Sequence, residues 1–416
     1  MKDSGVAWIG EIPETWSINK MKYIGTYING YAFKPDDWGN TGLPIIRIQD
    51  LTGSNNNPNY FNGNIDQKYY VENGDILVSW AATLDAFEWN KGEGWLNQHI
   101  FKAIPQKDIV SKPYYIWLLK VAMSYMNDDN KHGIMMQHIT LPVFNNFSIA
   151  IPPLEDQQKI AAHLDRKCTQ IDALISNAQQ QIEKLKAYKQ SVITETVTKG
   201  LDPDVQMKDS GVEWIGEIPE HWEIVRIKNI CQFNPSIKKS FSDDDIVSYA
   251  PMECVRTGSL VHKEIAIKNV SSGLTYFEEN DIIMAKVTPC FENGNIAIAT
   301  GLTKGMAFGS SELFVFRANE SIKFFLFYFL QNNIFKKFSI STMTGTGGLK
   351  RVSPNFVNNY SFALPPIEER NKIVFYLDRK CSQIDKLIDL KQQKIEKLQQ
   401  YKKSLIYEYV TGKKEV

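Results

Sequence analysis

Residues 145–175 read NNFSIAIPPLEDQQKIAAHLDRKCTQIDALI, and residues 358–388 read NNYSFALPPIEERNKIVFYLDRKCSQIDKLI. A stretch that returns 213 residues later is an internal repeat, and an internal repeat decides the architecture before any local pattern is considered. The likeness continues into QQQIEKLKAYKQS after the first copy and QQKIEKLQQYKKS after the second. We therefore expect the chain to contain two versions of one unit.

A shorter box marks the start of each copy. MKDSGVAWIGEIPETW at residues 1–16 and MKDSGVEWIGEIPEHW at residues 207–222 agree at 14 of 16 positions. The order is box, variable block and helical block, then all three again, with seven more residues in the second variable block. The helical block runs straight into the box in the middle of the chain. We predict the same join between the two ends, which gives a cyclic, pseudo-two-fold repeat with neighbouring termini.

Each helical block predicts one long helix. Pro152-Pro153 and Pro365-Pro366 can precede a helix but cannot lie inside one, so the helices should begin near Glu155 and Glu368 and run to about Lys199 and Thr411. Apolar residues recur at spacings of three and four: Ile160, Leu164, Ile171, Leu174, Ile175, Ala178, Ile182, Leu185, Tyr188 and Val192, then Ile373, Leu377, Ile384, Leu387, Ile388, Ile395, Leu398, Tyr401 and Leu405. This coiled-coil-like spacing predicts two antiparallel helices that bury their seams against each other. At about 1.5 Å per residue each would be about 65 to 70 Å long. The opposite face mixes acids and bases, which disfavours a membrane-binding helix pair.

The variable blocks, residues 17–144 and 223–357, alternate short strands with turns, as in LPIIRIQDL, NGDILVSW and HIFKAIP or DIVSYAPMECV, NDIIMAKV, NIAIAT and ELFVFRA. One helix is predicted in each, at about 113–126 and about 322–338. The fold class is therefore a mixed α+β fold, with two globular domains joined by the two long helices. The predicted domains are residues 1–150, a helical region 151–206, residues 207–363 and a helical region 364–416.

Composition gives a charge-balanced globular chain. The 416 residues carry 47 basic and 47 acidic side chains, and 43% hydrophobic content suffices for packed cores. The first variable block has a net charge of −1 and the second of +3. Such a chain should hold DNA weakly by itself, or only through focused patches. Five scattered cysteines without any C-x-x-C motif and the lack of a long apolar run favour a cytoplasmic protein with reduced thiols and no membrane partner.

The sequence lacks the usual motifs of a free-standing catalyst. TGTGGLKR at residues 344–351 has neither the spacing nor the Ser/Thr of a phosphate loop, and no H-E-x-x-H, paired C-x-x-C or G-x-S-x-G occurs. The Asp/Asn-Pro-Pro-Tyr/Phe motif of an amino-methyltransferase is also missing. We expect no catalytic residue and no metal site.

The arrangement resembles the specificity subunit of type I restriction-modification systems over essentially the whole chain. The resemblance rests on the doubled W-I-G-E-I-P-E-x-W box, the doubled [IL]-P-P-[LI]-E-[DE] start of a long helix, the L-D-R-K-C-x-Q-I-D-x-L-I segment and DIIMAKVTPCFENGNIAIA at residues 281–299. The Asn-Asn-aromatic-Ser segment and G-L-K-R-V-S also resemble that family.

The resemblance implies a subunit without catalytic activity whose two variable blocks are target recognition domains. Each would read one half of a split, nonpalindromic double-stranded DNA target, and the helices would fix the gap, at most roughly 20 bp at about 3.4 Å per pair. Two methyltransferase subunits would dock on the repeated frame and methylate adenine N6 with S-adenosylmethionine. The resemblance leaves open whether two motor-nuclease subunits, with ATP and Mg, add cleavage. This chain itself would bind no cofactor.

Candidate DNA-contacting residues lie in polar or Gly-rich segments of the variable blocks. Lys350 and Arg351 follow glycines, where backbone can approach DNA and Arg can reach guanine O6/N7 or a phosphate. The alternative is an ordinary solvated loop. The first-block equivalent, KHGIMMQHI at residues 131–139, adds Lys131, His132, Gln137 and His138.

Two further sets are weighed against structural roles. Lys286, Thr288 and Asn293 belong to KVTPCFENGN, which could equally be a structural turn, and Glu292 could accept from cytosine N4 or be structural. Arg47 and Gln49 alternate with Ile46 and Ile48, which predicts one strand face that meets either DNA or solvent. Asp75 and Asp281 precede apolar strands and are interpreted as turn residues.

The repeated boxes and helix surfaces carry separate predictions. Trp8, Trp16, Trp214 and Trp222 could pack the domains or contact a partner, and packing is favoured. The charged faces of the long helices are the expected docking surface for methyltransferase helices. Two other functions stay open, namely a coiled-coil scaffold without DNA specificity and the recognition half of another restriction or methylation enzyme.

Overall fold

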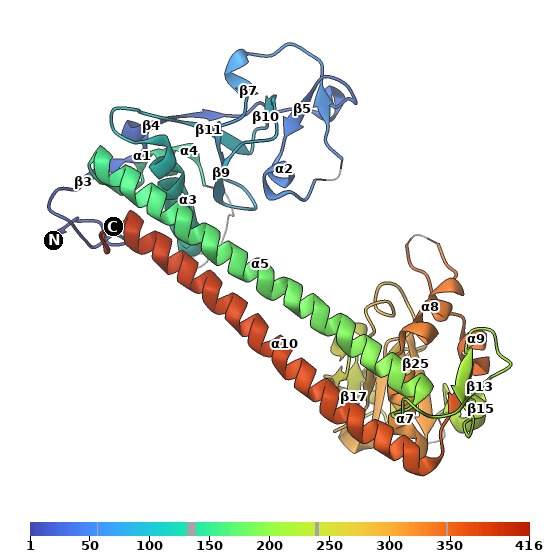
Figure 1. Cartoon of the computed structure of the whole chain (residues 1–416). Helices are drawn as coiled ribbons and strands as arrows, with labels where there is room; N and C mark the ends of the chain where they lie inside the picture. The colour runs from blue at the N-terminus through green and yellow to red at the C-terminus, as the bar shows by residue number, and fades with distance from the viewer. Residues whose placement is uncertain (56, 131–138, 238–240, 347) are drawn as a thin grey trace. The chain divides into compact units, whose positions relative to one another are not determined.

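The computed structural model describes residues 1–55, 57–130, 139–237, 241–346 and 348–416. These residues form two compact units, of which unit 1 comprises Met1–Ala178 and Gln393–Val416 and unit 2 comprises Gln179–Gln392. Two long helices, α5 (Leu154–Lys199) and α10 (Ile367–Val410), contribute to both units and are the green and red helices of Figure 1. The mixed α+β fold and the long helices were thus predicted correctly, since each helix begins directly after its Pro-Pro pair.

Within each unit the two helices are tied by an equivalent ion pair. Lys402 Nζ lies 2.7 Å from the Asp172 carboxylate in unit 1, and Lys189 Nζ lies 2.7 Å from the Asp385 carboxylate in unit 2. Each pair joins the repeat-equivalents of the other, because Asp385 follows Asp172 by 213 residues and Lys402 follows Lys189 by 213. The helices therefore run antiparallel in both units with one register.

The buried seam is narrower than the spacing predicts. Ile160, Leu164 and Ile171 are buried in unit 1, as are Ile373, Leu377 and Ile384 in unit 2. The predicted seam residues Leu174, Leu387, Tyr188 and Tyr401 are instead between 47% and 54% exposed. A two-helix pair can cover only one stripe of each helix, so apolar residues beside that stripe stay in contact with solvent. Cys168 and Cys381 are buried on equivalent turns, as expected of small packed residues.

Unit 1 is built around two four-stranded sheets. One has the order β4-β11-β8-β9 and the other β6-β5-β10-β7, in which β5 and β10 are parallel. The strands are β1 (Lys2–Asp3), β2 (Glu11–Ile12), β3 (Ser17–Lys20), β4 (Gly25–Asn29), β5 (Leu43–Ile46), β6 (Tyr60–Phe61), β7 (Tyr70–Val71), β8 (Ile76–Ser79), β9 (Asp85–Glu88), β10 (Gly94–Leu96), β11 (Ile100–Pro105) and β12 (Ser148–Ile151). The helices besides the long pair are α1 (Met21–Ile24), α2 (Ile48–Thr52), α3 (Lys112–Asn130) and α4 (Leu141–Asn146), with 3₁₀ turns at Pro35–Asp37 and Gln67–Tyr69.

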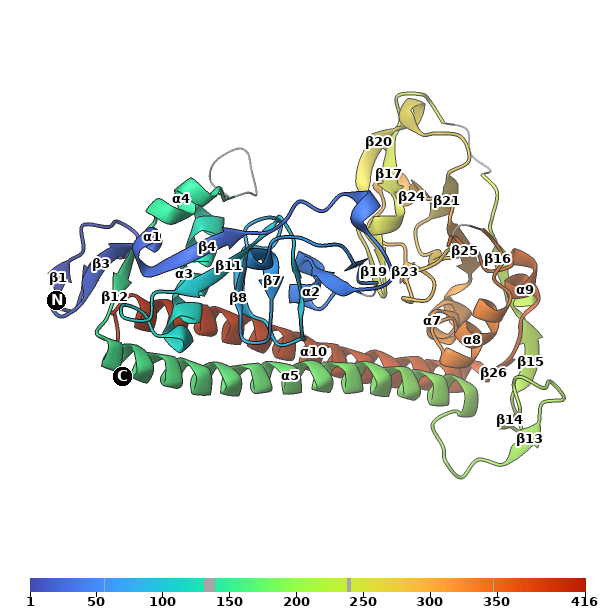
Figure 2. The same ribbon diagram turned by 90° about the horizontal axis from the view of Figure 1, so that it is seen from above.

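Unit 2 repeats this topology with sheets β16-β25-β22-β23 and β20-β17-β24-β21, again with one parallel pair, β17 and β24. Its strands are β13 (Met207–Asp209), β14 (Glu217–Pro219), β15 (Glu223–Arg226), β16 (Cys231–Phe233), β17 (Ile246–Ala250), β18 (Val255–Arg256), β19 (Ser259–Leu260), β20 (Lys263–Ala266), β21 (Thr275–Glu278), β22 (Ile282–Ala285), β23 (Ile296–Ile298), β24 (Met306–Gly309), β25 (Leu313–Ala318) and β26 (Ser361–Leu364). Its short helices are α6 (Ile227–Ile230), α7 (Glu320–Phe329), α8 (Asn333–Ser341) and α9 (Pro354–Asn359), with 3₁₀ turns at Met252–Cys254, Ile267–Asn269 and Thr303–Gly305. Figure 2 shows the long helices and the sheets of both units from a second direction.

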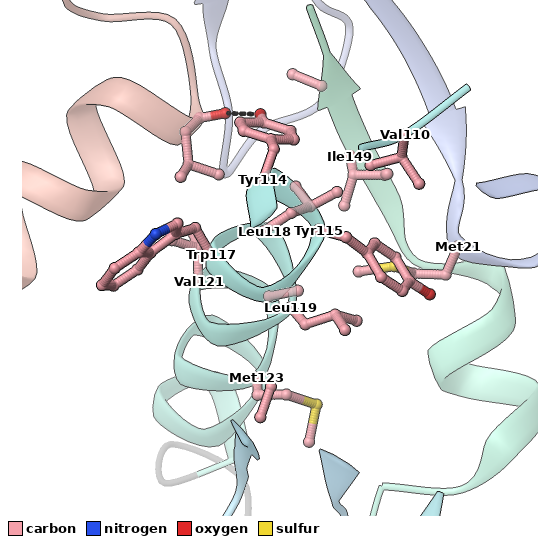
Figure 3. Packing of buried hydrophobic residues seen from close by; sticks show 14 of the residues in the cluster. Met21, Val110, Tyr114, Tyr115, Trp117, Leu118, Leu119, Val121, Met123 and Ile149 are labelled. Carbon is pink, nitrogen blue, oxygen red and sulfur yellow. Dashed lines mark hydrogen bonds between the residues drawn. The ribbon is translucent and has the colours of Figure 1, made fainter. Parts of the chain in front are cut away.

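Helix α3 forms the centre of the unit 1 core. Tyr114, Tyr115 and Leu119 are fully buried, and Figure 3 shows them packed among side chains from the neighbouring elements. The Tyr114 hydroxyl donates to the Val410 carbonyl at 3.2 Å, and Trp117 Nε1 donates to Asp165 at 2.8 Å. Helix α3 thereby fixes the sheets of unit 1 to the parts of α5 and α10 that belong to the same unit.

The helix predicted at about 322–338 is two helices. Helix α7 ends at Phe329, and Asn332 is the N-cap of α8, since its side-chain oxygen accepts from Phe335 N at 2.9 Å. Asn332 is only 1% exposed, so this cap lies inside the core beside Phe329 and Phe335. The prediction of one helix was wrong because continuous apolar periodicity concealed the Asn-Asn break.

The box tryptophans pack mainly inside their own units. Trp16 is 5% exposed and Trp222 is fully buried, while Trp8 and Trp214 are partly covered. Trp8 Nε1 donates to Ser148 O at 3.1 Å, and Trp214 Nε1 makes the equivalent bond to Ser361 O at 3.5 Å. The packing interpretation is confirmed for Trp16 and Trp222, although Trp214 keeps 38% of its surface exposed.

The two ends of the chain meet in unit 1, as predicted. The Tyr407 hydroxyl donates to Trp8 O at 2.7 Å, and the Lys413 ammonium donates to Glu11 O. The N-terminal box therefore packs on the end of α10, just as the second box packs beside the end of α5 in unit 2, where Trp222 and Val197 share one core. No helix in the described part of the chain has the length and apolarity needed to cross a membrane.

Candidate DNA interface

Three separate segments of unit 2 meet where β22 ends and β25 begins. Lys286 N donates to Glu312 O at 2.9 Å, and Val352 N donates to Lys286 O at 2.9 Å. Thr288 N donates to Lys350 O at 2.9 Å, which adds a third link. We call Lys286–Thr288, Glu312 and Lys350–Val352 the three-segment edge of unit 2. It brings together the predicted residues Lys286, Thr288, Lys350 and Arg351, although up to 65 residues separate them in sequence.

Arg351 is the most constrained cation of this edge. Its Nε lies 3.0 and 2.9 Å from the two Glu312 carboxylate oxygens, and its Nη2 lies 2.7 Å from Glu312 Oε1. The hydrogen bonds from Arg351 hold the pKa of the Glu312 carboxyl below its usual range, so the carboxylate is charged at neutral pH. The Arg351 side chain keeps 45% of its surface exposed, against 25% for Glu312. The guanidinium is thus held in place while one end still faces solvent.

The other predicted residues of unit 2 have different surroundings. Thr288 Oγ1 accepts from Lys350 N at 2.7 Å and lies within hydrogen-bond distance of two carbonyls, so its hydroxyl shapes the loop. Lys286 Nζ lies 5.6 Å from the centre of the Phe314 ring, and Lys350 is exposed. Asn293 is exposed in the next turn, where its N–H donates to Pro289 O. Asn293 therefore lies on the surface near this edge, and within the described residues it makes no hydrogen bond to the edge.

Glu292 points into the protein. Its Oε2 is buried and lacks a hydrogen-bond partner among the described residues. Burial lowers the pKa of Lys336, and the nearby charge of Glu292 opposes this shift. This placement favours the structural role that the sequence offered as the alternative to base contact.

Unit 1 has an edge of the same construction. Trp80 N donates to His99 O at 3.4 Å, and Ile139 N donates to Trp80 O at 3.2 Å. Trp80, His99 and Ile139 occupy the positions of Lys286, Glu312 and Val352, as the strand pairings Ile100 with Ser79 and Leu313 with Ala285 demonstrate. The predicted residues Lys131, His132, Gln137 and His138 lie outside the described residues. The backbone of this edge is alike in the two units, whereas its side chains differ.

A family model for the type I restriction modification DNA specificity domain matches this chain twice, at residues 13–184 and 219–400. The chain belongs to that family. The two matches cover most of the chain, and each includes one recognition region and the greater part of one long helix. This chain is therefore a DNA sequence-specificity subunit of a type I restriction-modification system.

Individual relatives agree with this assignment. The MjaVIII specificity subunit of Methanocaldococcus jannaschii is 25% identical over 415 residues, which span 97% of this chain and 93% of the relative. The EcoAI specificity subunit of Escherichia coli is 32% identical over 234 residues, which span 53% of this chain and 39% of the relative.

Solved structures share the fold. A chain from a structure that describes complex assembly and conformational transition of the type I system aligns with a TM-score of 0.71 at 13% identity, over 96% of this chain and 98% of that chain. The HsdS subunit from Thermoanaerobacter tengcongensis aligns with a TM-score of 0.51 at 15% identity, over 99% of this chain and 100% of that chain.

The specificity subunit departs from the sequence prediction at Arg47 and Gln49. Strand β5 ends at Ile46, and α2 begins at Ile48, so these side chains do not share a strand face. The Asp50 carboxylate accepts from Arg47 N at 2.8 Å, which turns the chain into the helix. The Arg47 guanidinium then lies 4.4 Å from the centre of the Trp38 ring. Gln49 is exposed on α2, and the predicted alternation was wrong because it overlooked the Asp50 cap.

Asp75 and Asp281 are turn residues, as predicted. The Asp75 carboxylate accepts from Glu72 N at 2.9 Å, and the Asp281 carboxylate accepts from Glu278 N at 2.7 Å. Each also pairs with a cation, Lys102 for Asp75 and Arg317 for Asp281. These pairs stabilise the start of β8, which leads to the unit 1 edge, and of β22, which leads to the three-segment edge of unit 2.

Sequence reasoning missed Glu312, His99 and Trp38. Glu312 and His99 come just before an apolar strand and carry no motif, but alignment of the two copies would have placed them at one position. Trp38 is 46% exposed, which is unusual for so large an apolar ring. Within the described residues, no group of three or more His, Cys, Asp or Glu side chains is arranged to hold a metal ion.

Proposed function

We propose that the two units read the two halves of one asymmetric, bipartite DNA target. The observation that supports this proposal is the three-segment edge of unit 2 and its unit 1 equivalent, which share two backbone hydrogen bonds but carry different side chains. Lys286 and Glu312 in unit 2 replace Trp80 and His99 in unit 1. Base edges are distinguished by the donors, acceptors and apolar groups presented to them, so different side chains on one frame should select different sequences.

The two long helices would hold the halves of the target a fixed distance apart. Each helix is continuous between Pro-Pro and a terminal glycine, and the Asp–Lys ion pairs set one antiparallel register in each unit. The length of a continuous α-helix is set by its number of residues, because each residue adds the same rise. The gap between the two half-sites would therefore be constant.

The repeated frame would dock two adenine-N6 methyltransferase subunits. Large apolar side chains are exposed at the same helix positions in both copies, namely Leu174 with Leu387 and Tyr188 with Tyr401. Exposed apolar groups that recur among charged residues fit protein docking better than solvation. S-adenosylmethionine would then be bound by the methyltransferases, and ATP and Mg by two motor-nuclease subunits where these are present. A subunit that acts on chromosomal DNA in this way would work in the prokaryotic cytoplasm.

The decisive experiment is a genome-wide map of N6-methyladenine in cells with and without this chain, at constant methyltransferase expression. We expect one bipartite motif, with two short halves around a fixed unspecified gap, to be lost without the chain. An exchange of residues 17–144 for the recognition block of another specificity subunit should change one half of the motif and leave the other half intact. Unchanged methylation in the presence of both proteins would contradict the proposal.

A further inference from the structure

The Arg351 guanidinium is only partly used by the protein. An arginine carries five N–H donors. Glu312 takes the Nε–H and one Nη2–H at 2.7 to 3.0 Å, and Nη1 has a single long contact of 3.5 Å to Leu349 O. Within the described residues, the second Nη2–H and one Nη1–H therefore have no acceptor, and the side chain is 45% exposed. The guanidinium thus offers two parallel donors, one from each terminal nitrogen.

Glu312 also changes what those donors can bind. A carboxylate at 2.7 Å offsets most of the guanidinium charge, so the pair attracts a distant phosphate weakly. The free N–H groups of Arg351 can still donate directional hydrogen bonds although the charge of the guanidinium is largely offset. The carboxylate also fixes the plane of the guanidinium before DNA binds. Two parallel donors in a fixed plane match guanine O6 and N7 in the major groove. Lys350 is the better phosphate ligand of this edge, since its side chain is exposed and its Nζ has no ion pair within the described residues.

The equivalent edge of unit 1 has no such pair in its described part. Trp80 and His99 stand where unit 2 has Lys286 and Glu312, and their rings lie 5.5 Å apart. The Glu312 position in unit 1 therefore supplies an imidazole instead of a carboxylate. The guanidinium held by a carboxylate is thus a feature of the unit 2 edge.

We propose that Arg351, positioned by Glu312, reads a guanine in the half-site that unit 2 recognises. This inference rests on the proposed division of the target between the units. It assigns Arg351 the base contact and Glu312 the role of a positioning residue. It also predicts that the unit 2 half of the motif contains at least one G·C pair.

The first test compares methylation motifs of the full chain and its variants in cells with the same methyltransferase. R351Q should make one G·C position of one half-site degenerate and leave the other half unchanged, with a loss of discrimination on the order of 10- to 100-fold. E312Q should relax the same position more weakly, and R351K should retain part of the preference. K350Q, the neighbouring control, should lower methylation at all sites alike and keep the motif.

The second test uses purified complex and DNA duplexes that carry the mapped motif. 7-Deazaguanine, which lacks the N7 acceptor, is substituted at each guanine of that half-site in turn. One substitution should weaken binding by the wild-type complex at least about fivefold and have no further effect on the R351Q complex. Each complex is compared with itself on two duplexes, so the comparison remains valid if one variant binds poorly overall. If R351Q does not fold, R351K takes its place, and the 7-deazaguanine substitution should weaken binding by the R351K complex less than binding by the wild-type complex.

The outcomes separate the two proposals. Absence of any bipartite motif for the wild-type chain would refute the proposed division of the target. A bipartite motif that R351Q and E312Q leave unchanged, or a uniform loss at all sites in R351Q, would refute the guanine contact alone. The uniform loss would identify Arg351 as a phosphate ligand.

Discussion

At the residue scale, Glu312 links the candidate site to stability. The bonds from Arg351 lower the pKa of Glu312 in the folded protein. A carboxyl with a lowered folded pKa stabilises the fold above its unfolded value, about 4.3, and loses this contribution as the pH falls through the folded pKa. Since both side chains are partly exposed to solvent, this contribution to stability should be small.

The matching measurement is urea unfolding of the wild type and E312Q between about pH 7 and about pH 3. The wild type should be more stable at neutral pH, and the difference should shrink as the pH falls. A difference independent of pH would mean that packing rather than charge stabilises this edge.

Two buried cysteines, Cys168 and Cys381, and the partly buried Cys231 give a second prediction for single residues. Burial raises the pKa of Cys168 and Cys381 to about 11 and that of Cys231 to about 12. The thiolate is the reactive form, and at pH 8 a thiol with a pKa of 11 is ionised in only about one molecule in a thousand. In native protein these three residues should react with iodoacetamide at least about tenfold more slowly than in the urea-unfolded chain, as peptide mass spectrometry would measure. Equal rates in both states would contradict their burial.

At the scale of elements, the sequence predicted the long helices well because Pro-Pro pairs and apolar periodicity are local signals. It missed the break between α7 and α8 and the turn into α2, since both depend on a single capping residue, Asn332 or Asp50. It also gave too wide a seam, because the spacing alone does not reveal that Leu174 and Tyr188 lie outside the contact. The residues of the candidate site were found only in part, because Glu312 joins Arg351 through a tertiary contact between distant segments.

The cap at Asn332 can be tested directly. N332A should lower the free energy of unfolding by about 1 to 2 kcal/mol, because it removes the N-cap of α8 from a buried position. N333A is the matched control, since Asn333 is exposed at the first position of the same helix and should change stability by less than about 0.5 kcal/mol. Urea unfolding monitored by circular dichroism measures both. Equal losses for the two variants would show that α8 does not depend on this cap.

At the scale of the whole molecule, repetition presents the exposed apolar positions of the long helices twice, once in each unit, and this suggests a test of assembly. L174A/Y401A alters exposed apolar positions of unit 1, and Y188A/L387A alters those of unit 2. Each variant should bind one methyltransferase instead of two, and the quadruple variant should bind none, as native mass spectrometry would report. Truncation of an exposed apolar contact commonly costs about 1 to 2 kcal/mol in an interface, or about 10-fold in affinity for each site.

The control is K184A/K397A, which changes two exposed, repeat-equivalent lysines of the long helices. Loss of the methyltransferase from the lysine variant alone would place docking on the charged helix faces, whereas full occupancy in the quadruple variant would remove the long helices' apolar positions from the interface.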